Sequence, residues 1–103
     1  MSVRCPLALA LCLAASGAAA DDEAGREVFT KTAQPPCALC HTLQAAGATG
    51  TVGPSLDEIR PDRQRVITTV REGIGVMPSF AEQLSDAQID AVADFVSRSA
   101  GTH

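Results

Sequence analysis

The segment Cys37-Ala38-Leu39-Cys40-His41 determines how the rest of this chain is interpreted. Two thiols separated by two residues and followed directly by an imidazole form the C-x-x-C-H pattern of c-type haem attachment. In that chemistry both cysteines bond covalently to the haem, and the adjacent histidine ligates its iron. The motif therefore predicts one covalent haem c on Cys37 and Cys40, with His41 as an iron ligand.

The two thiols could instead form a redox-active dithiol or a plain disulfide, both of which occur in oxidising compartments. A thioredoxin-like dithiol needs a β-α-β framework. The residues before the motif, Ala33-Gln34-Pro35-Pro36, and the glycine-rich segment after it have no strand pattern. The sequence therefore favours haem attachment.

Met77 is the second expected iron ligand. A methionine is more often core filler than a ligand. Here it lies in Gly-Ile-Gly-Val-Met-Pro-Ser-Phe, residues 73–80, where glycine and proline allow a tight loop that holds the thioether towards iron, opposite His41. A thioether paired with an imidazole raises a haem potential, so we expect a positive midpoint potential. The alternative ligand is His103, at the end of the chain.

Pro54 is the expected partner of the His41 ring. A ligating imidazole normally donates its other ring N–H to a carbonyl, which fixes the ring and strengthens the ligand. Proline has no N–H, and its carbonyl remains available as an acceptor. Gly53-Pro54 is also an ordinary turn sequence.

Residues 1–20 have the features of a cleaved secretory signal peptide. They contain one positive charge, at Arg4, an apolar run over residues 7–15, and three small residues before an acidic segment. The run is too short for a membrane span, which needs about 20 apolar residues. We therefore expect residues 21–103 to form one soluble periplasmic domain with no membrane span.

Removal of that signal would leave a small domain with one pair of cysteines. Cys5 and Cys12 lie in the signal, and Leu11 has the wrong size for lipoprotein processing at Cys12. A chain this short usually needs a disulfide, a metal or a large cofactor to complete its core. A covalent haem would meet that need in a sequence with three Phe and no Trp or Tyr.

We expect three main helices. The first begins at the acidic run 21–23, whose charges suit the positive end of a helix dipole, and continues to Phe29. Gly25 lies on the same face as Phe29, which indicates either close contact with another helix or fraying near a terminus. The last helix is expected to cross here, with Val92 and Phe95 beside these two residues.

The second helix is expected over residues 62–72, with Pro61 or Asp62 at its start and Gly73 just after its end. Its inner face is marked by three apolar residues, Val66, Ile67 and Val70.

The last helix has the clearest start signal. Ser85 and Gln88 form a capping box, and Leu84 can pack onto Ile89. Apolar residues then recur at the helical spacing, namely Ile89, Val92, Ala93 and Val96. We expect no strand, no internal repeat and no second domain.

The motifs, in their order along the chain, resemble a small single-haem class I cytochrome c. They are Gly-x-x-x-Phe, C-x-x-C-H, Gly-Pro, Val-Arg-x-Gly, Met-Pro-x-Phe and Ala-Val-Ala-x-Phe-Val. The resemblance covers essentially residues 21–103. It implies an all-α fold with about three main helices and loops wrapped around one covalent haem. It also implies thioethers at Cys37 and Cys40, iron ligation by His41 and Met77, and support of the histidine by Pro54.

The resemblance implies a one-electron carrier and not an enzyme. Residues 34–62 are also similar to periplasmic cytochromes that accept electrons from sulfite dehydrogenases, which implies such an enzyme as donor. An oxidase or another cytochrome would then be the acceptor. The alternative is a haem-based sensor or enzyme with a displaceable sixth ligand, which carbon monoxide binding to the ferrous protein would identify.

The formal net charge of the full chain is −4, which gives no support for nucleic-acid binding. Charged residues cluster on the last two helices, namely Arg60, Arg63, Arg65 and Arg71 around the second helix, and Asp86, Asp90 and Asp94 on the last. Such clusters are typical of solvated helix faces or of electrostatic steering towards redox partners.

Overall fold

The computed structural model describes residues 17–102, with side chains from residue 22 onward. Its helices are α1 (Gly17–Glu27), α2 (Cys37–Cys40), α3 (Leu56–Ile59), α4 (Arg63–Glu72) and α5 (Asp86–Ser99), joined by the π turn η2 (Val28–Thr32) and the 3-10 turn η3 (Gln44–Ala46). Two short strands, β1 (Thr42–Leu43) and β2 (Ala48–Thr49), form an antiparallel pair. The fold is therefore mainly helical, as the sequence predicts.

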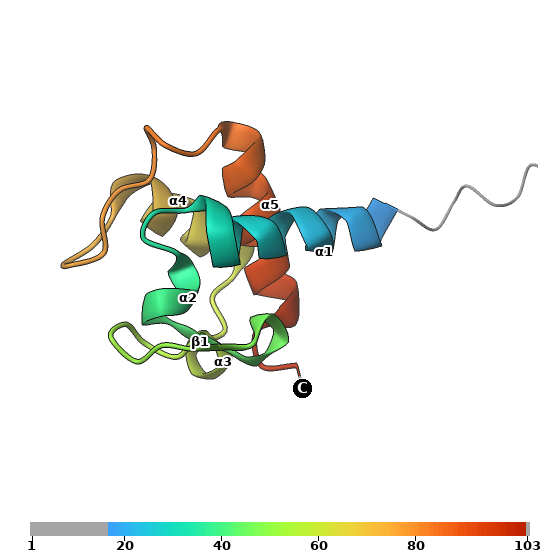
Figure 1. Ribbon diagram of the computed structural model, residues 1–103, viewed down its shortest axis with the longest axis horizontal. Helices are drawn as coiled ribbons and strands as arrows, with labels where there is room; N and C mark the ends of the chain where they lie inside the picture. Colours follow the sequence, from blue (N-terminus) through green and yellow to red (C-terminus); the bar gives the residue numbers. More distant parts are fainter. Residues whose placement is uncertain (1–16, 103) are drawn as a thin grey trace, which may run out of the picture.

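The crossing of α1 and α5 forms one side of the core (Figure 1). A Cβ atom at Gly25 would overlap the Ala91 carbonyl oxygen and the Phe95 Cβ, so only glycine allows this approach. The rings of Phe29 and Phe95 meet edge to face, with centroids 6.2 Å apart. The predicted crossing is confirmed, although the residue of α5 closest to Gly25 besides Phe95 is Ala91 and not Val92.

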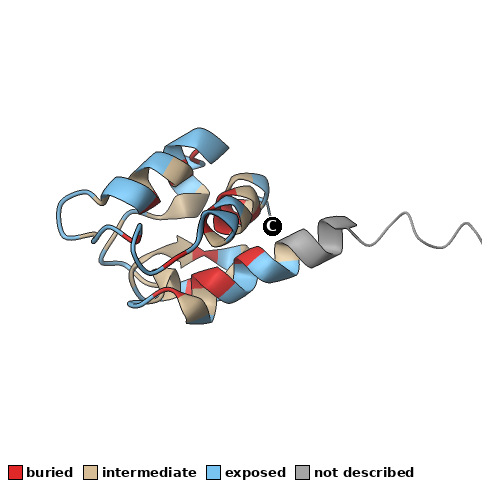
Figure 2. Ribbon diagram, turned by 90° about the horizontal axis from the view of Figure 1, so that it is seen from above, coloured by how far each residue is buried: buried red, intermediate tan, exposed pale blue. Residues whose placement is uncertain are grey.

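Buried positions follow one stripe along α1 and η2, namely Gly25, Val28 and Phe29, as Figure 2 shows in red. The core they join also contains Leu43 from β1 and Ile89, Val92 and Val96 from α5. None of the described side chains that are buried in this core is polar or charged.

The ends of α4 and α5 form as the sequence predicts. Asp62 caps α4 by accepting a hydrogen bond from the Arg65 N–H at 2.8 Å, and Gly73 ends the helix with a φ of 73°. Ser85 and Gln88 make both hydrogen bonds of the capping box, at 3.1 and 2.8 Å. Local sequence signals therefore set where these ends lie.

The expectation that the chain contains no strand is wrong. Thr42 pairs with Thr49 and Leu43 with Ala48, because the chain reverses between them through η3 and Gly47, whose φ is 65°. Pairs of two residues are too short to produce an alternating pattern in the sequence. Asp57 of α3 accepts hydrogen bonds from the N–H groups of Gln44 and Gly101, both at 2.8 Å, and ties this loop to the C-terminal segment.

The start of the first helix also differs from the expectation. Residues 17–20, the first that the structure describes, are already helical, so the acidic residues 21–23 lie within α1 and not in its first turn. The described helix thus includes four residues that the sequence assigns to the signal peptide. Cleavage after Ala20 remains a prediction.

The acidic residues of α5 form ion pairs with arginines of α4. The Nε of Arg63 lies 2.7 Å from an oxygen of Asp94, and a guanidinium nitrogen of Arg71 lies 3.0 Å from Asp86. The hydrogen bond to the Asp94 carboxylate and its negative charge raise the pKa of the Arg63 guanidinium. Two of the clustered arginines thus face the neighbouring helix.

The helices described within residues 17–102 are too short or too polar to span a lipid bilayer.

The contact at Gly25 gives a test of the fold. Gly25→Ala should lower the free energy of unfolding of the holoprotein by about 1–3 kcal/mol, because the added methyl group overpacks the helix crossing. Alanine would otherwise favour the helix by about 1 kcal/mol. The control is Glu23→Ala at an exposed position of α1, which should change the free energy by less than about 0.5 kcal/mol. Denaturant titration measures both, and a Gly25→Ala protein as stable as the wild type would contradict the close crossing.

Candidate functional site

A cavity of about 490 Å³ lies among η2, α2, α4, α5 and the connecting loops. Its volume is within the roughly 300–1,000 Å³ range of cofactor and ligand sites. Most of the residues that line it are apolar. All five site residues expected from the sequence line it, namely Cys37, Cys40, His41, Pro54 and Met77. The structure therefore brings together residues that are up to 40 positions apart in the chain.

Helix α2 is one turn long and carries both cysteines. It starts after Pro36, whose φ of −65° and ψ of 144° keep the preceding chain extended. Cys37 and Cys40 are three residues apart, so their side chains share one face of the turn. His41 leaves the helix in an extended conformation, while its N–H still donates to the Cys37 carbonyl at 3.0 Å. The C-x-x-C-H spacing thus directs two thiols and one imidazole to the same cavity.

The environment of Cys37 is unlike that of a redox-active thiol. Burial raises the pKa of the Cys37 thiol to about 11, with a backbone hydrogen bond opposing the shift and the nearby Cys40 adding to it. Redox-active cysteines usually have a lowered pKa, because the thiolate is the reactive species. The raised pKa therefore counts against the dithiol interpretation.

The His41 ring is oriented by the Pro54 carbonyl. The Nδ1 atom lies 2.8 Å from that oxygen. Because a carbonyl oxygen only accepts hydrogen bonds, Nδ1 must carry the ring proton, and Nε2 keeps the lone pair that a metal ion takes. The hydrogen bond expected from the sequence is present.

The backbone of Gly53 packs against the face of the His41 ring, a contact that the sequence did not predict. A Cβ atom at this position would lie 2.6 Å from His41 Cε1 and 3.0 Å from Nδ1. The imidazole therefore packs flat against a backbone that has no side chain. The Gly53 N–H also donates to the Cys40 carbonyl at 2.7 Å, which holds the loop against α2. The only sequence signal for this contact was the glycine next to Pro54.

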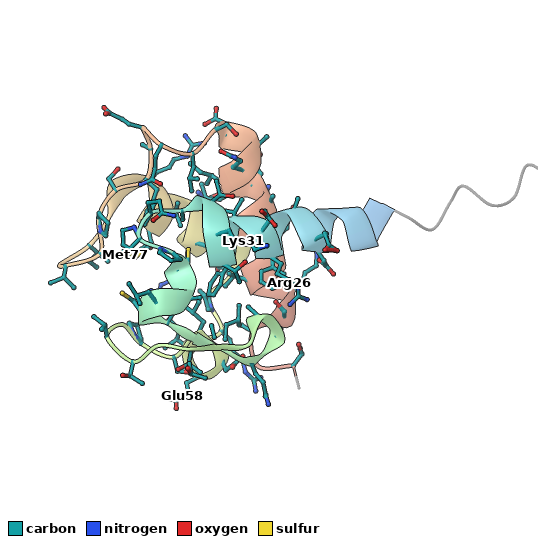
Figure 3. All side chains as sticks on the ribbon, viewed as in Figure 1. Arg26, Lys31, Glu58 and Met77 are labelled. Carbon is teal, nitrogen blue, oxygen red and sulfur yellow. The ribbon has the colours of Figure 1, made fainter. Side chains whose placement is uncertain are left out.

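Met77 reaches the cavity from the loop between α4 and α5. Two backbone hydrogen bonds join Ile74 and Met77, at 3.0 and 2.9 Å, and close a four-residue turn. Gly75 has a φ of 57°, as the first central residue of a type II′ turn requires. Figure 3 shows Met77 on the same side of the molecule as α2. The turn presents the partly buried thioether to the cavity that His41 also lines.

These residues fit a c-type haem. Two thiols on one helical turn would hold it covalently, and an imidazole and a thioether from separate segments would supply ligands for its iron. Within residues 17–102, no group of three or more His, Cys, Asp or Glu side chains could hold a metal ion by itself. His103, the alternative ligand, lies outside the described residues.

Comparisons with known proteins agree with this chemistry. The family model described as "Cytochrome C oxidase, cbb3-type, subunit III" matches residues 20–96. The chloroplastic cytochrome c6 of Chlamydomonas reinhardtii is 34% identical over 97 residues, which cover 84% of this chain and 60% of that protein. The crystal structure of the c-type cytochrome SorU from Sinorhizobium meliloti is 52% identical with a TM-score of 0.78, and the match covers 81% of this chain and 94% of that one.

The motif order, the helical fold and the family match lead to the same assignment. This chain spans 60% of the length of the curated cytochrome c6, so it corresponds to the greater part of that protein and not to all of it. The chain belongs to the cytochrome c family, as a small class I cytochrome c with one covalently bound haem c.

Proposed function

We propose that this protein is a soluble periplasmic one-electron carrier in which His41 and Met77 are the axial ligands of the haem iron. The observation that carries the proposal is that both side chains line the same cavity as Cys37 and Cys40, although they come from different segments. Haem c supplies the Fe(III)/Fe(II) couple. The chain supplies the attachment points, the axial ligands and the apolar surroundings.

Two protein ligands leave no coordination position for a substrate. His41 is fixed by the Pro54 carbonyl at 2.8 Å and by the backbone of Gly53, and Met77 is fixed by its hydrogen-bonded turn. Ligands held on both sides move little when the charge on iron changes. This arrangement favours rapid electron transfer over bond chemistry, and it is the reason to prefer a carrier to a sensor or an enzyme.

The same groups favour a positive midpoint potential. A neutral thioether is a weaker donor than a second imidazole, and an apolar cavity destabilises the extra positive charge of Fe(III).

Three apolar side chains at the cavity, Val52, Ile74 and Val76, are 71%, 71% and 89% exposed. Exposed apolar residues beside a redox centre suit transient contact with partner proteins.

The periplasmic location rests on residues 1–20, which we propose to be a signal peptide that is removed after Ala20. The electron donor rests on the similarity of residues 34–62 to periplasmic cytochromes that serve sulfite dehydrogenases. We therefore propose a sulfite dehydrogenase as donor and an oxidase or another cytochrome as acceptor.

Replacement of Met77 tests the ligand assignment. Met77→Ala should abolish the sulfur-to-iron charge-transfer band of the ferric protein, lower the midpoint potential and allow the ferrous protein to bind carbon monoxide. Each change follows from the loss of the thioether from iron. Absorption spectroscopy and a redox titration measure them. Glu82→Ala, at an exposed position of the same loop that does not line the cavity, is the matched control and should keep the wild-type spectrum.

A wild-type holoprotein that has haem by intact mass but never shows this band would contradict Met77 ligation. Carbon monoxide binding to the wild-type ferrous protein would then favour a sensor or an enzyme with an open sixth position.

The donor is tested separately. Ferric holoprotein mixed with sulfite and a catalytic amount of sulfite dehydrogenase from the same organism should be reduced much faster than with sulfite alone, as followed by absorption. If the enzyme adds nothing to the rate, the donor assignment fails while the carrier assignment stands.

A further inference from the structure

Four arginines lie on or just before α4, and the structure separates their roles. Arg63 and Arg71 pair with carboxylates of α5, at 2.7 and 3.0 Å. The guanidinium of Arg60 packs against Gly101 near the C-terminus. Arg65 differs from these three, because it lines the haem cavity.

Arg65 is the one Lys, Arg, Asp or Glu residue among the described residues that line this cavity. Its backbone N–H donates to the capping carboxylate of Asp62, but within residues 22–102 its guanidinium has no hydrogen-bond or ion-pair partner. Its neighbours on the cavity side of α4, Val66 and Thr69, also line the cavity. The guanidinium of Arg65 therefore lies, without a partner among these residues, at the rim of a cavity that no other described Lys, Arg, Asp or Glu side chain lines.

The chemistry of haem supplies a partner for this cation. Haem has two propionate carboxylates, on pyrrole rings other than the two whose vinyl groups react with cysteines. A carboxylate next to an apolar cavity loses hydration unless a donor compensates for it. Arginine is the best suited side chain, because its planar guanidinium can donate two parallel hydrogen bonds to one carboxylate.

We propose that the guanidinium of Arg65 binds a propionate carboxylate of the haem. Arg65 is then a cofactor-binding residue that anchors the edge of the haem away from the thioethers. The inference rests on the haem-carrier function proposed above. It predicts an electrostatic effect on iron, because a fixed positive charge beside the haem disfavours Fe(III) relative to Fe(II).

Arg65→Gln tests this contact against Arg60→Gln. Both variants remove one positive charge, at positions five residues apart, but Arg60 does not line the cavity. At pH 8, where propionates are ionised, Arg65→Gln should shift the Fe(II)/Fe(III) ratio at a fixed applied potential about fivefold towards Fe(III). The shift should persist at high salt, since a contact pair is poorly screened. Arg60→Gln should give a smaller shift that salt removes.

The second readout uses the wild-type holoprotein and needs no variant. In the ferrous, diamagnetic state, proton NMR should show nuclear Overhauser effects between the Arg65 side chain and propionate methylene protons. This measurement tests the contact between Arg65 and the propionate even if Arg65→Gln fails to yield holoprotein. Absence of these effects, or equal potentials for the two glutamine variants, would overturn the assignment.

Results that refute the proposed electron-carrier function differ from results that refute only the Arg65 contact. A wild-type protein without haem mass, or without the sulfur-to-iron band, would refute the proposed carrier itself. Haem and band present, with no propionate contact at Arg65, would refute this inference alone.

Discussion

A large part of the core of this protein faces a cavity and not another part of the chain. Six of its buried apolar side chains line that cavity, namely Phe29, Val66, Val70, Phe80, Val92 and Val96. A chain of this size has too little apolar surface to fill the space by itself. The helices therefore pack around the haem, and the bound cofactor completes the core. Stability and redox chemistry depend on the same contacts.

The two proposed haem ligands are positioned by backbone groups more than by other side chains. The Pro54 carbonyl and the Gly53 backbone fix the His41 ring, and a two-hydrogen-bond turn fixes Met77. Backbone support costs little side-chain entropy and adds no competing ligand. Backbone support also explains why glycine and proline lie next to both proposed ligands. A substitution at such a position can move a ligand and change the redox potential of the iron without contacting the iron itself.

The sequence predicts those parts of the fold that have a recognisable residue pattern. The caps of α4 and α5, the C-x-x-C-H turn, the Pro54 hydrogen bond and the Gly25 contact all have residue patterns with a direct physical cause. The strand pair at Thr42–Leu43 and the support of His41 by Gly53 were missed, because each depends on how a loop folds back. The position of Arg65 at the cavity was also not predictable, since the sequence grouped it with three arginines that point elsewhere.

Proton NMR of the wild-type ferrous protein can detect whether Met77 ligates the iron opposite His41, as proposed. A methionine methyl group bound at iron lies over the haem ring, whose ring current shields its protons strongly. If Met77 ligates iron, a single three-proton resonance from its methyl group should appear far upfield of the ordinary methyl region. A holoprotein in which that resonance is absent, or in which the Met77 methyl group resonates with the core methyls, would contradict ligation by Met77.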